Sequence, residues 1–555
     1  MTVPVYRSLI DAFLTHSVDR CFGLLGDGNL SFMMGMLDTP GMRVVQARHE
    51  SSAVTMAAGF SRATGEVSLA SVTAGPGLTH AITALTAAVR ASLPLVLYAG
   101  DVQQEAAGPD SLQVLDHEAV ARLTGAAYVR IDGRGDPFEI ASDAIRRARD
   151  RRLPVLMSVP VDYAESSEDR TTRRETTGPG PLAATDVAGS RPSQAPAESL
   201  VREAEAALRR SRRPLFVIGT GAVEAGLVPT IRELAALCGA RVCETFRAKG
   251  ALDMDDPLSV GLFGPLAHAM DQSIQEQADL IIGLGADLHG FGAFVDALWS
   301  CSSYALGEEA RCAEGPDNAA GVALAAALEV LGRTDPAPPD EQPWTKSRAW
   351  CEAVESDLAE FSPPIESGAV DPRLAMRHLD NLLPDDCVIV IGGGHFWSFP
   401  TMYLSKRRRE FVFPIEFGSI GMALPTGIGC ATATGRPVVV IDGDGGLMMG
   451  LPELESVVRE GLDVTVVVIN DSALGAEYHK AVARGFAPGG AAYRSVSFEA
   501  TAQALGGQGR TIADLSDLEA IRDIGHEDPE AASLKLIDVR SSTAVTSRWY
   551  RRLYL

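Results

Sequence analysis

Two acidic residues in the C-terminal third of the chain stand where they could bind a cation and a phosphate group. The segment VVVIDGDGGLMMGLPELESVVREGLDVTVVVINDSALG contains a Gly-Asp-Gly-Gly turn with Asp444, followed 24 residues later by Asn470 and Asp471. Two carboxylates plus a loop carbonyl suit a hard ion such as Mg²⁺. Glycine N–H groups at the start of a helix can approach a phosphate ester. Taken alone, Gly-Asp-Gly is equally compatible with a plain turn.

A third acidic residue, Glu50, lies in the N-terminal part, in VVQARHESSAVTMAAGFSRATG. It precedes a predicted helix, and the segment ASVTAGPGLTHAITAL places Gly75-Pro76-Gly77 before the next predicted helix. A carboxylate here can activate a bound cofactor. It can also be an ordinary residue of a first helical turn, where the helix dipole favours negative charge.

Predicted strands position both groups of residues. Residues 43–47 and 66–73 precede Glu50 and Gly75, and residues 437–441 and 464–469 precede Asp444 and Asp471. A strand, turn, helix and strand within about 35 residues place the two strands parallel in one sheet. If they are neighbours, about 4.8 Å separates them and the two aspartates can converge. Open α/β sheets bind ligands at such carboxyl ends.

The chain divides into three predicted domains, residues 1–165, 198–333 and 346–555, joined by linkers at 166–197 and 334–345. Each alternates short Val/Ile/Leu runs with longer helical patterns, which predicts an α/β fold of three doubly wound parallel-sheet domains. The middle domain opens with PLFVIGTGAVEAG. Its Gly-x-Gly favours a structural turn over a dinucleotide site, because the acidic ribose partner about 20 residues on is missing.

Composition excludes several classes of function. A net charge of −23 argues against nucleic-acid partners, which require clustered Lys and Arg. Eight cysteines without a Cys-x-x-Cys pair indicate neither zinc nor disulfides, so we expect a cytoplasmic protein. No stretch approaches about 20 uninterrupted apolar residues, so we expect no membrane span.

The Gly-Asp-Gly to Asn470-Asp471 pattern resembles the thiamin diphosphate motif of the pyruvate decarboxylase and acetohydroxyacid synthase superfamily. RHE, AAGFSRATG and GPG resemble the cofactor-activating segment of the same superfamily, and the resemblance extends over essentially the whole chain. It implies a pyrimidine-binding first domain, a central Rossmann-like domain and a diphosphate-binding third domain. In the family the two cofactor-binding domains come from different subunits, which implies a homodimer or homotetramer.

The resemblance also implies a ligand set. Mg²⁺ would be held by the side chains of Asp444 and Asp471 and the backbone carbonyl of Ala473. Family members usually carry Asn-Asn where this chain has Asn470-Asp471, so the metal must offset one additional negative charge. The glycines and the histidine expected to contact the diphosphate are Gly443, Gly445 and Gly446, together with Gly394 and His395 from GGGHFWSFP.

By the same resemblance Glu50 would hydrogen-bond N1′ of the aminopyrimidine. This favours the imino tautomer, whose nitrogen removes the proton from C2 of the thiazolium; the cofactor supplies the chemistry and the protein the geometry. Thr73 and Gly75 would line that half of the site. Ile420, in FGSIGMALPTGIG, would support the bent cofactor, although it also fits an ordinary core position. Many relatives have Asn where this chain has His80, and no role follows from that difference.

Three further residues concern the substrate. Asp27, in GLLGDGNLSF, and Glu477, in ALGAEYHK, match the active-site carboxylates of pyruvate decarboxylase and could relay protons. An N-cap and a surface helix residue are the alternatives. The stretch VQQEAAGPDSLQVLDHE lacks that enzyme's paired histidines and places Gln113 at the glutamine of acetohydroxyacid synthase.

We therefore expect an enzyme that decarboxylates a 2-oxo acid and adds the acyl anion to an aldehyde or a second keto acid. A non-ligating 2-oxo acid decarboxylase and an acyl-CoA lyase remain alternatives. A catalytically silent regulatory subunit would be expected to lose Glu50 or Asp444, and both are present. A nicotinamide or flavin oxidoreductase would use the middle domain. FAD is unexpected, because the acidic strand end used by flavin-binding relatives is missing after GLGADL.

Overall fold

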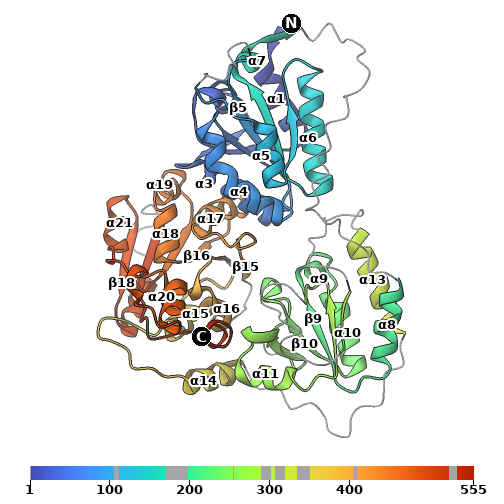
Figure 1. Cartoon of the computed structure of the whole chain (residues 1–555), viewed down its shortest axis with the longest axis vertical. Helices are drawn as coiled ribbons and strands as arrows, with labels where there is room; N and C mark the ends of the chain where they lie inside the picture. The colour runs from blue at the N-terminus through green and yellow to red at the C-terminus, as the bar shows by residue number, and fades with distance from the viewer. Residues whose placement is uncertain are drawn as a thin grey trace.

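A computed structural model describes residues 2–104, 112–169, 198–253, 256–288, 302–306, 319–333, 350–405, 409–523 and 534–555. Figure 1 shows the first domain (blue) above the third (orange to red), with the middle domain (green) beside the third. All of the second predicted linker and most of the first lie outside the described residues. In the described part, no helix has the length and apolar character needed to cross a membrane.

The first domain is a parallel sheet of six strands with helices packed around it. Every residue of its central strands β4, β5 and β7 is buried, as expected for apolar runs covered on both faces. In sheet order the strands are β3 (Arg43–Gln46), β2 (Arg20–Gly23), β4 (Ser68–Val72), β5 (Leu95–Asp101), β7 (Val155–Pro160) and β6 (Ala127–Arg130). The helices are α1 (Val5–Thr15), α2 (Leu30–Leu37), α3 (Glu50–Thr64), α4 (Pro76–Arg90), α5 (His117–Thr124), α6 (Pro137–Arg151) and α7 (Val161–Glu165). Outside this sheet, β1 (Thr2–Pro4) pairs with β8 (Ser167–Asp169).

The third domain repeats the same strand order. Its sheet reads β15 (Glu410–Val412), β14 (Val388–Ile391), β16 (Val438–Gly443), β17 (Val464–Asn470), β19 (Leu534–Arg540) and β18 (Gln508–Ile512). In both sheets the first strand in sequence lies between the second and third, and ligands of such sheets bind where the strand order reverses. The helices are α14 (Trp350–Glu360), α15 (Pro372–Leu382), α16 (Ser398–Tyr403), α17 (Ala423–Thr434), α18 (Asp444–Gly450), α19 (Glu453–Glu460), α20 (Gly475–Ala483), α21 (Phe498–Ala504) and α22 (Arg548–Tyr554).

The middle domain has a five-stranded parallel sheet. Its order is β11 (Ser259–Leu262), β10 (Arg241–Glu244), β9 (Pro214–Ile218), β12 (Leu280–Leu284) and β13 (Ser302–Leu306). The helices are α8 (Glu198–Leu208), α9 (Thr220–Glu224), α10 (Val228–Cys238), α11 (Ala269–Gln275) and α13 (Ala319–Gly332). A side chain at Gly219, in the Gly-x-Gly turn, would overlap the carbonyl oxygen of Gly285. Close packing of two loops thus requires this glycine. The predicted α/β class with three parallel-sheet domains is confirmed.

Helices α3 and α17 join the first domain to the third. Two glycines allow their backbones to approach: a Cβ at Gly59 would overlap the carbonyl oxygen of Thr426, and a Cβ at Gly429 that of Met56. Buried Glu416 adds ion pairs with Arg62 of α3, at 2.7 Å, and with Arg247 of the middle domain, at 3.6 Å. The position of α3, and of Glu50 at its start, is therefore fixed against the third domain.

We expect Gly429→Ala to destabilise the protein by about 1–3 kcal/mol, because the added methyl group forces the two helix backbones apart. Thermal unfolding measures the effect. Gly489→Ala is the matched control, since nothing lies within 4 Å of a Cβ at that position. Equal unfolding midpoints for the two variants would contradict this account of the helix contact.

Candidate active site

A cleft opens at the carboxyl ends of β14, β16 and β17 in the third domain. It brings together residues that lie up to 84 positions apart in the sequence, from Gly393 to Glu477. The residues predicted for this half of the site line the cleft: Gly394, His395, Ile420, Gly443, Asp444, Gly445, Gly446, Asp471, Ala473 and Glu477. The strands place them there because β16 and β17 are parallel neighbours, with Gly443 opposite Ile469.

Asp444 and Asp471 are the two aspartates of this cleft. Asp444 accepts the N–H of Gly445 on Oδ1 at 2.9 Å, and Asp471 accepts the N–H of Ala473 on Oδ1 at 3.1 Å. The other oxygen of Asp444 is buried, and the described residues offer it no hydrogen-bond partner. A buried acceptor of this kind indicates an ion, water or ligand as its partner. The donor set of two carboxylates fits a hard divalent cation.

Burial makes ionisation of both carboxyl groups unfavourable. It raises the pKa of Asp471 from 3.8 to about 7, helped by the neighbouring charge of Asp444. It also raises the pKa of Asp444 to about 6. A cation between them would favour the charged forms, because an opposite charge offsets both desolvation and repulsion.

His395 forms one wall of the cleft. Its Nδ1 lies 3.8 Å from Oδ2 of Asp471, and burial, with the nearby His479, lowers its pKa to about 3. The ring is therefore neutral at physiological pH and can hydrogen-bond without adding charge. A Cβ at Gly475 would overlap this ring, so glycine is required there.

Two tyrosines that no motif indicated support the cleft. Tyr493 donates its hydroxyl to the carbonyl oxygen of Ala473 at 3.1 Å, and burial beside Asp444 raises its phenol pKa. Tyr550, in α22, donates to the carbonyl oxygen of Ala476 at 2.7 Å. The C-terminal helix thus packs against the start of α20, which carries Glu477. Both contacts use backbone carbonyls, which leave no signature in the sequence.

Glu50 begins α3 in the first domain and is 9% exposed. His49 caps the helix by accepting the N–H of Ser51 on Nδ1 at 3.1 Å. Oε2 of Glu50 lies 3.0 Å from Nδ1 of His80, while Oε1 lies 3.8 Å from the point where a Cβ at Gly77 would stand. The sequence showed His80 but gave no reason to connect it with Glu50.

The remaining predicted residues of the first domain gather near the same sheet edge. Gly28, next to exposed Asp27, donates its N–H to Oγ1 of Thr73 at 3.0 Å. Asp27 itself begins a short 3-10 helix after the N-cap Gly26, so it does not cap α2. Gln113 has a φ of 69°, and its Cβ lies 2.8 Å from where a Cβ at Gly75 would be.

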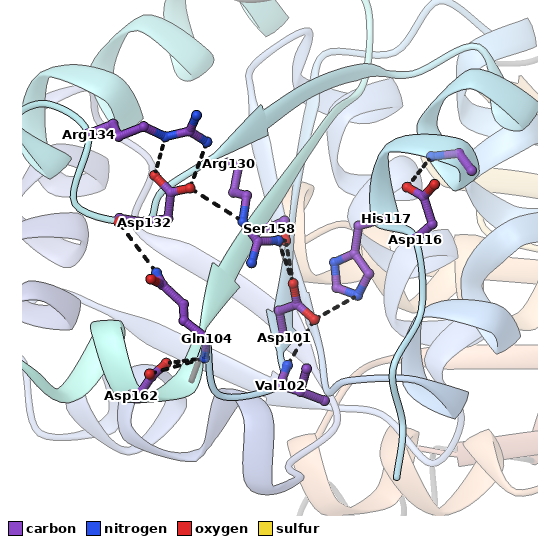
Figure 2. Close-up of polar contacts among 11 residues, drawn as sticks. Asp101, Val102, Gln104, Asp116, His117, Arg130, Asp132, Arg134, Ser158 and Asp162 are labelled. Carbon is purple, nitrogen blue, oxygen red and sulfur yellow. Dashed lines mark hydrogen bonds and ion pairs between the residues drawn. The ribbon is translucent and has the colours of Figure 1, made fainter. Parts of the chain in front are cut away.

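A polar network surrounds Asp101 in the first domain (Figure 2). Asp101, at the end of β5, accepts from Arg130 at 2.6 Å and from Ser158 at 3.3 Å, and lies 3.7 Å from Nε2 of buried His117. The network thus links the end of β5 to β6, β7 and the start of α5.

The two halves of the site lie on different domains of the chain. Arg48 links their domains by donating its N–H to Oε1 of Glu453 at 2.9 Å and pairing with Glu455. In the described part of the chain, no hydrogen bond, ion pair or ring contact joins Glu50 to a residue of the cleft.

We expect the metal-free protein to lose stability as the pH rises. A folded-state pKa raised from 3.8 to about 7 means that Asp471 stabilises the fold at low pH, and this stabilisation is lost as the pH rises from about 4 through 7. Asp471→Asn should flatten this dependence, measured as unfolding midpoints in chelator. The exposed Asp38→Asn serves as control. Identical pH dependence in Asp471→Asn and the unmodified protein would refute the assignment.

Sequence models of one enzyme family match three parts of the chain. They are the thiamine pyrophosphate enzyme N-terminal TPP binding domain at residues 4–120, the central domain at 201–298 and the C-terminal TPP binding domain at 391–533. Together they span more than half of the chain. Thiamine pyrophosphate is another name for thiamin diphosphate.

Several acetolactate synthases are similar in sequence. The acetolactate synthase large subunit of Parasynechococcus marenigrum is 27% identical over 488 residues, covering 85% of this chain and 76% of that protein. The isozyme 2 large subunit of Escherichia coli is 25% identical, covering 84% and 83%. In fold, the chain resembles a thiamine diphosphate-dependent 4-hydroxybenzoylformate decarboxylase of Rhodococcus jostii RHA1, with a TM-score of 0.71, 22% identity and coverage of 97% and 99%.

The cleft with its paired carboxylates and glycine turn falls within the C-terminal match, and Glu50 within the N-terminal match. This chain belongs to the thiamine pyrophosphate enzyme family and is a thiamin diphosphate-dependent enzyme.

Proposed function

We propose that the enzyme uses thiamin diphosphate and Mg²⁺ to decarboxylate a 2-oxo acid and to join the remaining acyl carbon to a second carbonyl compound. The observation that carries this proposal is the pairing of Asp444 and Asp471 in one cleft, with a buried oxygen of Asp444 unpartnered among the described residues. Such a pair requires a cation, and a cation beside a glycine turn at a helix start binds a diphosphate.

The third-domain residues would hold the cation and the diphosphate. Asp444, Asp471 and the carbonyl of Ala473 would be the metal ligands, with Tyr493 fixing that carbonyl. The diphosphate contacts would come from Gly443, Gly445 and Gly446 and from the Gly394–His395 turn. A neutral His395 adds a hydrogen-bonding group without disturbing the charge balance.

Glu50 and Ile420 would prepare the cofactor for reaction. When bound, thiamin diphosphate supplies a carbon nucleophile that attacks the substrate carbonyl and stabilises the carbanion left by loss of CO₂. Glu50 would hold a proton at N1′ of the pyrimidine, and Ile420, on the cleft wall, would support the bent shape. Thr73 and Gly75 would line the pyrimidine end.

A second subunit would complete the site. In the described part of one chain, no hydrogen bond or ion pair joins Glu50 to the cleft, and large apolar side chains are exposed beside both halves. Leu474 is 39% exposed at the cleft and Leu112 is 88% exposed beside Gln113. On α2, Leu30, Met34 and Leu37 form an exposed stripe at helical spacing. Exposed apolar patches of this kind support burial against another copy, as a homodimer or homotetramer.

Asp27, Gln113 and Glu477 would act on the substrate. Asp27 and Gln113 lie at the first-domain edge, and Glu477 lines the third-domain cleft. In the proposed dimer they would face each other across the bound cofactor. Asp27 and Glu477 could then pass protons to or from the reacting carbon, while Gln113 would orient the acceptor carbonyl.

The named relatives favour carboligation over simple decarboxylation. The relatives named above are acetolactate synthases. The segment around Gln113 also resembles the stretch of acetohydroxyacid synthase that carries a glutamine. A non-ligating decarboxylase is the second candidate. The Rhodococcus structure is named a decarboxylase, but that likeness bears on fold alone. The acyl-CoA lyase and regulatory-subunit alternatives, the absence of FAD and a cytoplasmic location stay predictions.

The decisive experiment supplies the enzyme with thiamin diphosphate, Mg²⁺ and a panel of 2-oxo acids, with and without aldehyde or keto acid acceptors. We expect CO₂ release with formation of a 2-hydroxy ketone from an aldehyde acceptor or a 2-acyl-2-hydroxy acid from a keto acid acceptor, identified by mass. Free aldehyde as the sole product would support the decarboxylase instead. Omitting Mg²⁺ after chelation should abolish turnover.

We expect Glu50→Gln to slow activation of the bound cofactor by about 10²-fold or more, because the amide cannot take up the charge and proton that the carboxylate holds at N1′. Exchange of the C2 proton with deuterated solvent, followed by NMR after acid quenching, measures this directly. The exposed Glu66→Gln is the matched control. Exchange in Glu50→Gln at the rate of the control would overturn the role of Glu50.

A further inference from the structure

His80 is the hydrogen-bonding partner of the Glu50 carboxylate in the described part of the chain. It lies on α4, and its Nδ1 is 3.0 Å from Oε2 of Glu50. A carboxylate oxygen accepts, so in the neutral ring Nδ1 carries the hydrogen and donates it. This leaves a lone pair on Nε2, as in a histidine whose tautomer is set by an adjacent carboxylate.

The two oxygens of Glu50 face different surroundings. Oε2 is taken by His80, whereas Oε1 is directed toward Gly77, where the missing side chain leaves space. One oxygen can therefore serve N1′ of the pyrimidine while the other remains bonded to the imidazole. Oε1 would thus face the ligand, while Oε2 faces the protein.

In the single chain, side-chain exposure increases from Glu50 to His80. The Glu50 side chain is 12% exposed and the His80 side chain 53%. Glu50 must gain and lose a proton as the pyrimidine changes tautomer, but its own access to water is small. His80 connects it with the more accessible edge of the site.

The His80 ring is held in orientation by His49. The two rings stack with centroids 5.0 Å apart and planes 24° from parallel. His49 is itself fixed, because its Nδ1 accepts the N–H of Ser51 as the cap of α3. The rotation that would carry Nδ1 away from Glu50 is thereby restricted.

We propose that His80 is the proton-transfer residue that connects Glu50 with solvent during cofactor activation. This inference rests on the proposed role of Glu50. In the step, Nε2 accepts a proton from water or a buffer acid while Nδ1 passes its own proton to Oε2 of Glu50. The carboxylate becomes a carboxylic acid, the imidazole stays neutral as its other tautomer, and the reverse transfers release the proton.

His80→Ala and His80→Asn test the inference together. Asparagine can still donate a hydrogen bond to Glu50 but cannot relay a proton, so it separates proton transfer from positioning. We expect both variants to slow C2 proton exchange at least about tenfold with the affinity for thiamin diphosphate preserved. Free imidazole should restore the rate in His80→Ala. The exposed His378→Ala is the control.

A readout without cofactor checks the geometry. Nitrogen-15 NMR of selectively labelled histidine in the cofactor-free protein should show His80 with its hydrogen on Nδ1. That preference should be lost in Glu50→Gln.

Wild-type exchange in His80→Asn, or no rescue of His80→Ala by imidazole, would overturn the inference. If Glu50→Gln slows exchange and the His80 variants do not, only the relay fails. If Glu50→Gln leaves exchange unchanged, the proposed function fails first.

Discussion

The site depends on two buried carboxylates that neighbouring parallel strands bring into one cleft. β16 and β17 run side by side, so the residues that follow their carboxyl ends, Asp444 and Asp471, have little freedom to separate. Burial raises the pKa of both groups, and the charge of Asp444 raises that of Asp471 further. A counter-charge would lower both pKa values and favour the doubly ionised pair. Around the two aspartates lie neutral His395, the hydroxyl of Tyr493 and the glycines at 443, 445 and 446.

The first and third domains share one strand order but carry different side chains at the edge where their strands end. In the third domain the sheet edge carries Asp444, Asp471 and a glycine turn, which would suit a metal and an anion. In the first domain the corresponding edge carries Glu50, Thr73 and Asp27. The middle domain shares the parallel architecture but not the order. Its Gly-x-Gly turn is explained by the approach of Gly219 to Gly285.

Much of this arrangement follows from sequence because it is local. A run such as VVVIDGDGG contains both the buried strand and the turn that ends it, so Asp444 could be placed at a strand end directly. The strand predicted at 437–441 extends to Gly443 in the structure, since the backbone stays paired with β17 up to Ile469. Glu50, Thr73 and Gly75 were placed in the same way.

Contacts between distant segments could not be predicted. The hydrogen bonds of Tyr493 and Tyr550 reach backbone carbonyls, which any sequence possesses. His80 lies thirty residues from Glu50, and only the crossing of α3 and α4 unites them. Asp101, Arg130 and His117 come from three elements and follow no spacing rule. The domain boundaries and the catalytic assignments still stand as predictions.

The contact between α3 and α17, where glycines pack against backbone atoms, limits how this enzyme can change in evolution. Helix α3 starts at Glu50, and α17 starts three residues beyond Ile420. In each chain both residues therefore lie near the starts of two helices whose backbones are in contact. Main-chain contact therefore sets how the first domain is oriented on the third within each chain. In the proposed dimer this orientation determines where the Glu50 edge of one chain meets the cleft of the other, so side chains such as Asp27, Gln113 and Glu477 can be replaced without moving the two halves apart.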